Sequence, residues 1–305
     1  MARSFSGQAG VELTGEREDC ENLVRLDRKL DVTQRDFLRD KHNVVYNRVP
    51  KTGSGPARVF MEKCFKRRGD VTKFFTSFQR KHNERSMDDV LRSVSQSLSS
   101  LQTPWLFVGH VNFINFTKYG MKEMPIYVNL VREPVSCFVS MYYFVRFKHP
   151  RPMSDVTRNR TFDQCVLEND PECSDPLSTT RLLPFFCGHD PVCATGNNAS
   201  LALAKRNVLR YYSVVGYLEN IEEFYEALEF MLPHVFSGIV AEFRKYGNSR
   251  EKVSQGKKKV EPSTRAVEEF KRRIPHEIEL YRFLRHRFDC MMTQILKQKM
   301  TSRTV

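Results

Sequence analysis

The chain lacks a long apolar stretch. Within its 305 residues no run is long and apolar enough to span a bilayer, and the first thirty residues contain no apolar signal-peptide core. The cysteines and sequons considered below nevertheless favour the secretory pathway, which requires a targeting signal or anchor. We therefore expect either a fragment without its N-terminal anchor or a sequence with an incorrect first exon.

Motifs that mark several common functions are also absent. The P-loop pattern Gly-x-x-x-x-Gly-Lys-Ser/Thr is missing, which argues against kinases and GTPases. No nucleic-acid-binding motif and no internal repeat is recognisable. The tight Cys-x-x-Cys pairs that are typical of zinc sites are missing too.

Charge of one sign is in excess. Lys and Arg number 49 and Asp and Glu number 36, which gives a formal net charge of +13. Such a balance favours a polyanionic partner, which could be nucleic acid, an anionic membrane surface or an acidic polysaccharide. Charge alone does not choose among the three.

The most informative segment is 44–56, with the sequence VVYNRVPKTGSGP. A short β-rich run ends in a loop that contains Lys51, Thr52, Gly53 and Ser54. Free backbone N–H groups, a point positive charge and hydroxyl donors suit a bound phosphate, and a helix beginning after the loop would add its dipole. The lysine precedes the glycines, which points to a phosphate-containing donor other than a nucleoside triphosphate. The alternative is a strand that ends in an ordinary glycine-rich turn.

Four of the eight cysteines are clustered in a loop-like region. Cys165 and Cys173 lie eight residues apart, and Cys187 and Cys193 lie six apart. These spacings favour two short-range disulfides in an oxidising compartment. His189, between the second pair, keeps a metal site as the alternative.

Three N-glycosylation sequons point to the same compartment. They begin at Asn115, Asn159 and Asn198. Asn115 lies within an apolar run, whereas Asn159 and Asn198 lie in polar segments near the cysteines. We therefore predict glycans at Asn159 and Asn198.

The pattern of apolar residues predicts one α/β domain at 41–297, between a polar leader or stem at 1–40 and a polar tail at 298–305. Segments 148–200 and 247–262 are predicted to be loop-rich, the second one mobile. Strands are predicted at 44–46, 74–78, 105–108, 125–131 and 212–217, and helices at 57–66, 87–101, 135–147, 201–209, 221–232 and 265–296.

Short strands that alternate with helices imply a mostly parallel sheet covered on both faces. Ligands of such sheets bind beyond the carboxyl ends of the strands. Lys51, His110 and Arg132 each follow a predicted strand end. We therefore expect these three side chains to converge.

In this order the motifs resemble the uronyl 2-O-sulfotransferases of the Golgi, which include the heparan sulfate and the dermatan/chondroitin enzymes. The similarity covers roughly residues 40–290, and segment 165–173 looks closer to the dermatan/chondroitin branch. Val108 stands where the heparan branch is expected to have a second histidine. The matching segments are 46–52 (YNRVPKT), 109–113 (GHVNF), 131–134 (VREP) with Ser140, 162–169 (FDQCVLEN), 171–173 (PEC) and 184–189 (PFFCGH).

The resemblance implies a P-loop-like sulfotransferase fold that uses 3′-phosphoadenosine 5′-phosphosulfate and no metal. His110 would be the general base that takes the proton from the acceptor hydroxyl. Lys51 would neutralise the leaving phosphate. The residues implied to hold the donor are Arg48, Lys51 and the amides of Thr52, Gly53 and Ser54 at the 5′-phosphosulfate, Arg132 and Ser140 at the 3′-phosphate, and Lys258 and Lys259 in a basic loop over the nucleotide.

The acceptor implied is a uronic acid 2-hydroxyl in a glycosaminoglycan, with dermatan or chondroitin sulfate favoured and heparan sulfate second. The resemblance further implies disulfides Cys165–Cys173 and Cys187–Cys193, a homotrimer, and a type II membrane protein of the Golgi lumen whose anchor is absent from this sequence. No nucleic acid partner is expected. The alternative function is a non-catalytic polyanion-binding protein with a sulfotransferase-like fold. Arg146 and Lys148 could meet substrate anions or simply face solvent.

Overall fold

The computed structural model describes most of the region in which the domain was predicted. The described residues are Cys20, Leu23, 43–67, 71–75, 86–148, 152–175, 182–251 and 259–301, without the side chains of 71–75 and 248–251. None of the helices in these ranges is long and apolar enough to cross a membrane.

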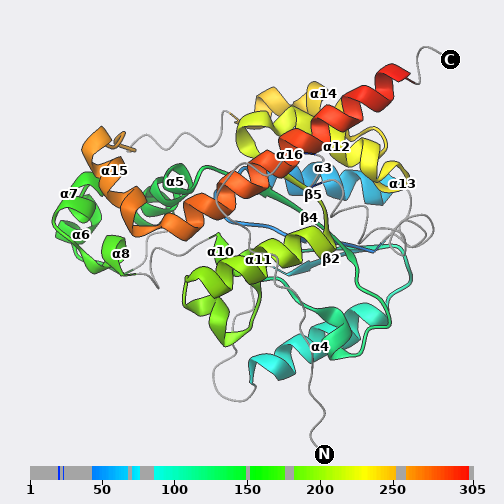
Figure 1. Ribbon diagram of the computed structural model, residues 1–305, viewed down its shortest axis with the longest axis horizontal. Coiled ribbons are helices and arrows are strands. Elements are labelled where there is room, and N and C mark those ends of the chain that lie inside the picture. The colour runs from blue at the N-terminus through cyan, green and yellow to red at the C-terminus, as the bar shows by residue number, and fades with distance from the viewer. Residues whose placement is uncertain are drawn as a thin grey trace, which may run out of the picture.

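The described strands form one parallel sheet of five in the order β2-β3-β1-β4-β5, which confirms the predicted α/β class (Figure 1). β1 lies at its centre, and every residue of β1, β3 and β4 is buried. Strands that are buried on both faces read as continuous apolar runs, which is why the sequence revealed them. The strands are β1 (Val44–Asn47), β2 (Val71–Phe75), β3 (Trp105–Gly109), β4 (Ile126–Val131) and β5 (Tyr212–Tyr217).

Helices cover both faces of the sheet. In Figure 1, α3, α12, α14 and α16 lie above the sheet, and α4, α10 and α11 lie below it. A third group, α5 to α8 with α15, extends to one side. The helices are α3 (Ser54–Arg67), α4 (Met87–Ser99), α5 (Pro134–Phe147), α6 (Asp155–Asn159), α7 (Phe162–Leu167), α8 (Pro171–Ser174), α10 (Leu183–Cys187), α11 (Asn198–Tyr211), α12 (Ile221–Met231), α13 (Pro233–Phe236), α14 (Ile239–Glu251), α15 (Thr264–Arg273) and α16 (Pro275–Thr301), with 3₁₀ turns η1 (Phe116–Tyr119), η2 (Pro191–Ala194) and η3 (Leu218–Asn220).

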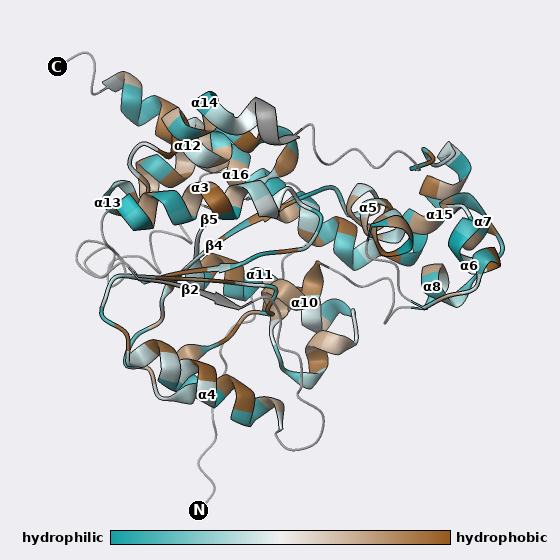
Figure 2. Cartoon of the chain, turned by 180° about the vertical axis from the view of Figure 1, so that it is seen from behind, coloured by the Kyte–Doolittle hydropathy of each residue, from teal (hydrophilic) through white to brown (hydrophobic). Residues whose placement is uncertain are grey.

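Apolar residues concentrate in the sheet and on the helix faces turned toward it (Figure 2). A second, smaller core joins α5 to α7 and α15, where the Phe138 ring centroid lies 4.6 Å from that of Phe270. This second core attaches the lateral helices rigidly to α5.

Four predictions of secondary structure are wrong in part. The strand predicted at 74–78 begins three residues earlier, because β2 spans Val71–Phe75, and residues 76–78 lie outside the described part. Segment 148–200 contains short helices, because Ser154, Thr161 and Asp170 cap their first turns and disulfides hold them. In the predicted loop 247–262, helix α14 continues to Glu251, and the Phe243 ring lies where a Cβ on Gly247 would point. The final helix is two helices, because Pro275 begins α16 after a break at Ile274.

Both predicted disulfides, Cys165–Cys173 and Cys187–Cys193, are present, so these cysteines do not form a metal site. A third disulfide, which the sequence did not reveal, joins Cys20 to Cys290 of α16. Leu23 is buried as well, so two residues of the predicted leader contact the domain.

Candidate active site

The loop between β1 and α3 has the shape of an anion cradle. Lys51 and Gly53 both have positive φ, of 66° and 73°. The positive φ favours glycine at position 53, and a Cβ there would lie 2.6 Å from Leu218 Cδ1, so that the leucine side chain would have to move. The first N–H groups of α3 have no acceptor within the helix, and they begin where this loop ends.

The hydroxyls of this loop face inward. Thr52 Oγ1 and Ser54 Oγ both donate to the main-chain oxygen of Val49, at 2.9 and 2.8 Å, and both residues are buried. The idea that these hydroxyls bind a phosphate is therefore wrong. Their bonds shape the loop, which leaves its backbone N–H groups and Lys51 as the groups suited to an anion.

Lys51 lies among other cations. Its Nζ is 3.9 Å from the centroid of the Phe144 ring, and its main-chain oxygen accepts a bond of 3.4 Å from Arg132 Nη1. Burial, followed by the charges of Lys148 and Arg132, lowers the pKa of Lys51. The structure thus brings the predicted Lys51 and Arg132 together in a place that an anion would stabilise.

His110 makes two contacts with Arg48. Arg48 Nη2 lies 2.7 Å from His110 Nε2, and His110 Nδ1 lies 2.9 Å from the main-chain oxygen of Arg48. A guanidinium can only donate, so Nε2 must accept and the ring proton must sit on Nδ1. Burial, and then the positive charge of Arg48, lowers the pKa of His110. The imidazole is therefore held neutral, with the lone pair of a base on Nε2.

A buried amide network lies directly beneath this pair. Asn47, the residue before Arg48, donates from Nδ2 to the oxygen of Phe185 at 2.8 Å. Asn129 Nδ2 donates to the main-chain oxygen and to Oδ1 of Asn47, and the Tyr212 hydroxyl donates to the same Oδ1. We did not predict these residues. Two asparagines inside otherwise apolar strands were the signal that could have identified them.

The start of α5 differs from the expectation. The carboxylate of Glu133 accepts from the N–H groups of Val135 and Ser136, at 3.1 and 2.7 Å. These amides are therefore occupied by a side chain, and a phosphate would not take them. Arg132 and Ser140, both half-buried, remain as the side chains of this region suited to an anion.

The remaining predicted residues lie elsewhere or outside the described part. Lys258 is not among the described residues, and Lys259 pairs with Glu261 at 2.8 Å. Arg146 is buried against Glu172, at 2.6 Å, so it is a structural residue and does not face a substrate.

The predicted glycan acceptors Asn159 and Asn198 are both exposed. Asn198 Oδ1 lies 2.7 Å from His276 Nε2. Their occupation by glycans stays a prediction.

Comparison with known proteins identifies the family of the chain. The sequence pattern described as "Sulfotransferase family" matches residues 34–289. The chain belongs to this family. Its relatives include the uronyl 2-sulfotransferases of Mus musculus and Homo sapiens, each 34% identical over 84% of this chain, and the heparan sulfate 2-O-sulfotransferase 1 of Xenopus laevis, 33% identical over 84%. The matched part spans 63% of the length of the two uronyl 2-sulfotransferases and 73% of the Xenopus protein.

Family membership implies a sulfate donor, and the residues present fit one. Lys51 and Arg132 lie together at the N-terminal end of α3, and burial, followed by the charges of Lys148 and Arg132, lowers the pKa of Lys51. Uncompensated positive charge beside free helix N–H groups is what a sulfate or phosphate group requires.

Proposed function

We propose that this protein transfers a sulfuryl group from 3′-phosphoadenosine 5′-phosphosulfate to the 2-hydroxyl of uronic acid residues in a glycosaminoglycan. The observation that carries the proposal is the pairing of His110 with Arg48 beside the Lys51 loop. It provides a neutral base next to an anion cradle, which is what transfer to a hydroxyl needs. The names and the degree of identity of the relatives support the same reaction.

The reaction breaks the O–H bond of the acceptor and one S–O bond of the donor, and it forms a new S–O bond and an N–H bond on the base. The donor supplies the sulfuryl group and a phosphate leaving group. His110 Nε2 accepts the hydroxyl proton, and the main-chain oxygen of Arg48 keeps the Nδ1 proton in place. Arg48 must first release Nε2, because a lone pair that already accepts a bond of 2.7 Å cannot take a proton. Lys51 provides the point charge for the leaving phosphate.

Dermatan or chondroitin sulfate is the favoured acceptor, and heparan sulfate is the second. The segment 165–173 supports this order, together with Val108 at the place where the heparan branch is expected to have a second histidine. We further propose the Golgi lumen as the compartment, supported by the disulfides and by the exposed Asn159 and Asn198. A homotrimer is proposed on the family resemblance alone.

The test is incubation of the purified protein with labelled donor and with desulfated dermatan, chondroitin and heparan in parallel. Disaccharide analysis of the product then identifies the sulfated uronate. His110→Ala is expected to abolish transfer and to leave the affinity for 3′-phosphoadenosine 5′-phosphate nearly unchanged. Salt-sensitive binding without label on any polysaccharide would instead favour the polyanion-binding alternative, which the charge of +13 motivates. Full activity of His110→Ala would exclude the assigned base.

A further inference from the structure

A polar cavity of about 310 Å³ lies between α15 and the turn after α7. None of its lining residues belongs to the candidate active site. Polar side chains dominate the lining, with a single apolar member. The lining residues are Leu167, Asn169, Arg265, Glu269, Arg272 and Arg273.

One of the three arginines builds the wall of the cavity. Arg273 Nη2 donates to the oxygen of Val166 at 2.9 Å and to Asn169 Oδ1 at 2.7 Å, and Nη1 donates to the oxygen of Cys173 at 3.2 Å. The donors of this side chain are thus largely used by the protein itself. Arg273 therefore positions the wall and contributes its charge.

The other two arginines are available to a ligand. Arg272 forms an ion pair with Glu269, yet 72% of its side chain is exposed. Arg265 is exposed, and no carboxylate among the described residues pairs with it. The lining contains three guanidinium groups and one carboxylate, that of Glu269, which pairs with Arg272 and Arg273, so the cavity carries net positive charge.

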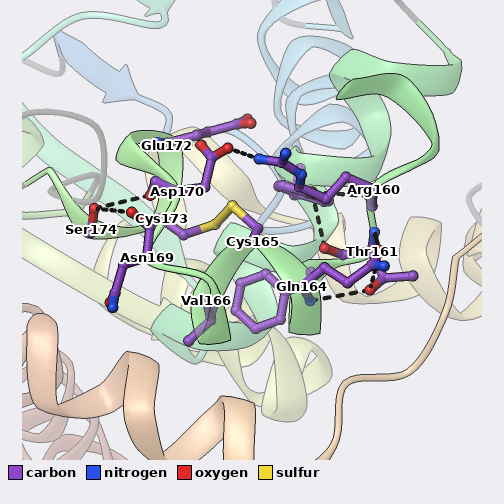
Figure 3. The surroundings of a disulfide bond; sticks show 12 residues. Arg160, Thr161, Gln164, Cys165, Val166, Asn169, Asp170, Glu172, Cys173 and Ser174 are labelled. Atoms are coloured by element: carbon purple, nitrogen blue, oxygen red, sulfur yellow. Dashed lines mark hydrogen bonds and ion pairs between the residues drawn. A yellow bond between two sulfur atoms is a disulfide. The ribbon is translucent and has the colours of Figure 1, made fainter. Parts of the chain in front are cut away.

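The cavity is rigid on both sides. On one side the Cys165–Cys173 disulfide and the Arg160–Asp170 ion pair hold the turn that carries Asn169 (Figure 3). On the other side, Phe270 of α15 packs against Phe138 of α5. A preformed site loses little conformational entropy when it binds a ligand.

We propose that this cavity is a second anion site, which binds a sulfate or carboxylate group of an acidic polysaccharide away from the point of transfer. Arginine suits this role because its planar fork donates two parallel bonds to an oxyanion. α15 packs on α5, the helix that begins two residues after Arg132, so both sites lie on one rigid unit. Only the identity of the polysaccharide rests on the proposed function.

The test compares two double variants that remove equal charge. Arg265→Ala/Arg272→Ala changes the cavity, and Arg92→Ala/Arg206→Ala removes two exposed arginines from α4 and α11. Affinity for long dermatan sulfate is measured at fixed ionic strength, with inorganic sulfate and single-stranded DNA as competitors. The cavity variant is expected to lose about tenfold in affinity, and the control variant less than twofold.

Equal losses in both variants would overturn the proposal, because the effect would then be net charge alone. Displacement of the polysaccharide by millimolar inorganic sulfate would show a site for free anions and overturn it also. The proposal would also be overturned if single-stranded DNA competed with the polysaccharide and its affinity fell in the cavity variant as much as that of the polysaccharide. Unchanged melting temperatures and an unchanged affinity for 3′-phosphoadenosine 5′-phosphate establish that the fold and donor site of both variants are intact. Because the readout is binding, the result stands even if the proposed transfer activity fails.

Discussion

Replacing Asn129 with leucine tests whether the buried amide network supports the site. Asn129 is fully buried. The pairing of β1 with β4 ends at Tyr46, and the side chain of Asn129 donates to the main-chain oxygen of the next residue, Asn47. Leucine has the same branching and the same number of side-chain heavy atoms as asparagine, and it cannot form the bonds. The substitution removes the donor to the main-chain oxygen of Asn47 and the acceptor, at 2.8 Å, for the N–H of Leu130.

The expected cost follows from the groups left unpaired. Each buried polar group without a partner costs about 1–3 kcal/mol, so two of them cost about 2–6 kcal/mol. Asn47 Oδ1 adds little, because the Tyr212 hydroxyl still donates to it at 3.1 Å. An unfolding entropy of about 2.1 cal/mol/K per residue amounts to roughly 0.6 kcal/mol/K for this chain, so the melting temperature should fall by about 3–9 °C.

Tyr212→Phe is the matched control, and calorimetry with the disulfides intact is the assay. The hydroxyl that it removes has one proton, which it shares between Asn47 Oδ1 and the oxygen of Phe185, and each acceptor keeps another donor. The expected cost is therefore about 1 kcal/mol, or roughly 1–2 °C. An unchanged melting temperature for Asn129→Leu, or equal decreases for both variants, would refute the reasoning from unpaired groups.

Two further predictions concern the reacting groups. Arg48→Gln removes the cation that lowers the pKa of His110, so that pKa should rise. Only the neutral imidazole is a base, so the acid limb of the pH profile of kcat/KM should lie below the usual histidine pKa in the wild type and move to higher pH in the variant. The same shift should appear when the His110 pKa is measured by NMR without donor. An unchanged acid limb, or an unchanged His110 titration, would contradict the pairing of Arg48 with His110. Lys51→Ala should reduce turnover far more than polysaccharide affinity measured by titration, and comparable losses in both would count against its role at the leaving phosphate.

Much of the fold was predictable because parallel strands leave a strong local signal. β1, β3 and β4 are buried throughout and read as apolar runs, so their positions were predicted to within a residue or two. The short helices between residues 154 and 187 were missed, because helices of four to six residues contain too few turns to show a period. The break before α16 could have been predicted from Pro275, which accepts only a first-turn position.

The place of three predicted site residues in the fold was predictable, and their contacts were not. Lys51, His110 and Arg132 follow strand ends that a parallel sheet must bring to one edge. The inward hydroxyls of Thr52 and Ser54 depend on the exact path of the loop, which residue type does not specify. The same holds for Glu133, whose carboxylate caps the helix beside the predicted anion site.

The sequence by itself determined the α/β class, the family, the cysteine pairs at 165–173 and 187–193, and the positions of the lysine and the histidine. The class and the positions of these residues depend on local periodicity, spacing and residue chemistry, whereas the family and the cysteine pairing follow from the resemblance of the ordered motifs. Only the tertiary structure decided that Arg48 occupies Nε2 of His110, that Asn47 and Asn129 join across β1 and β4, and that Cys20 pairs with Cys290. Each of these contacts joins residues at least 62 positions apart, and their separation in space is set by sheet register and helix packing, which no local pattern encodes.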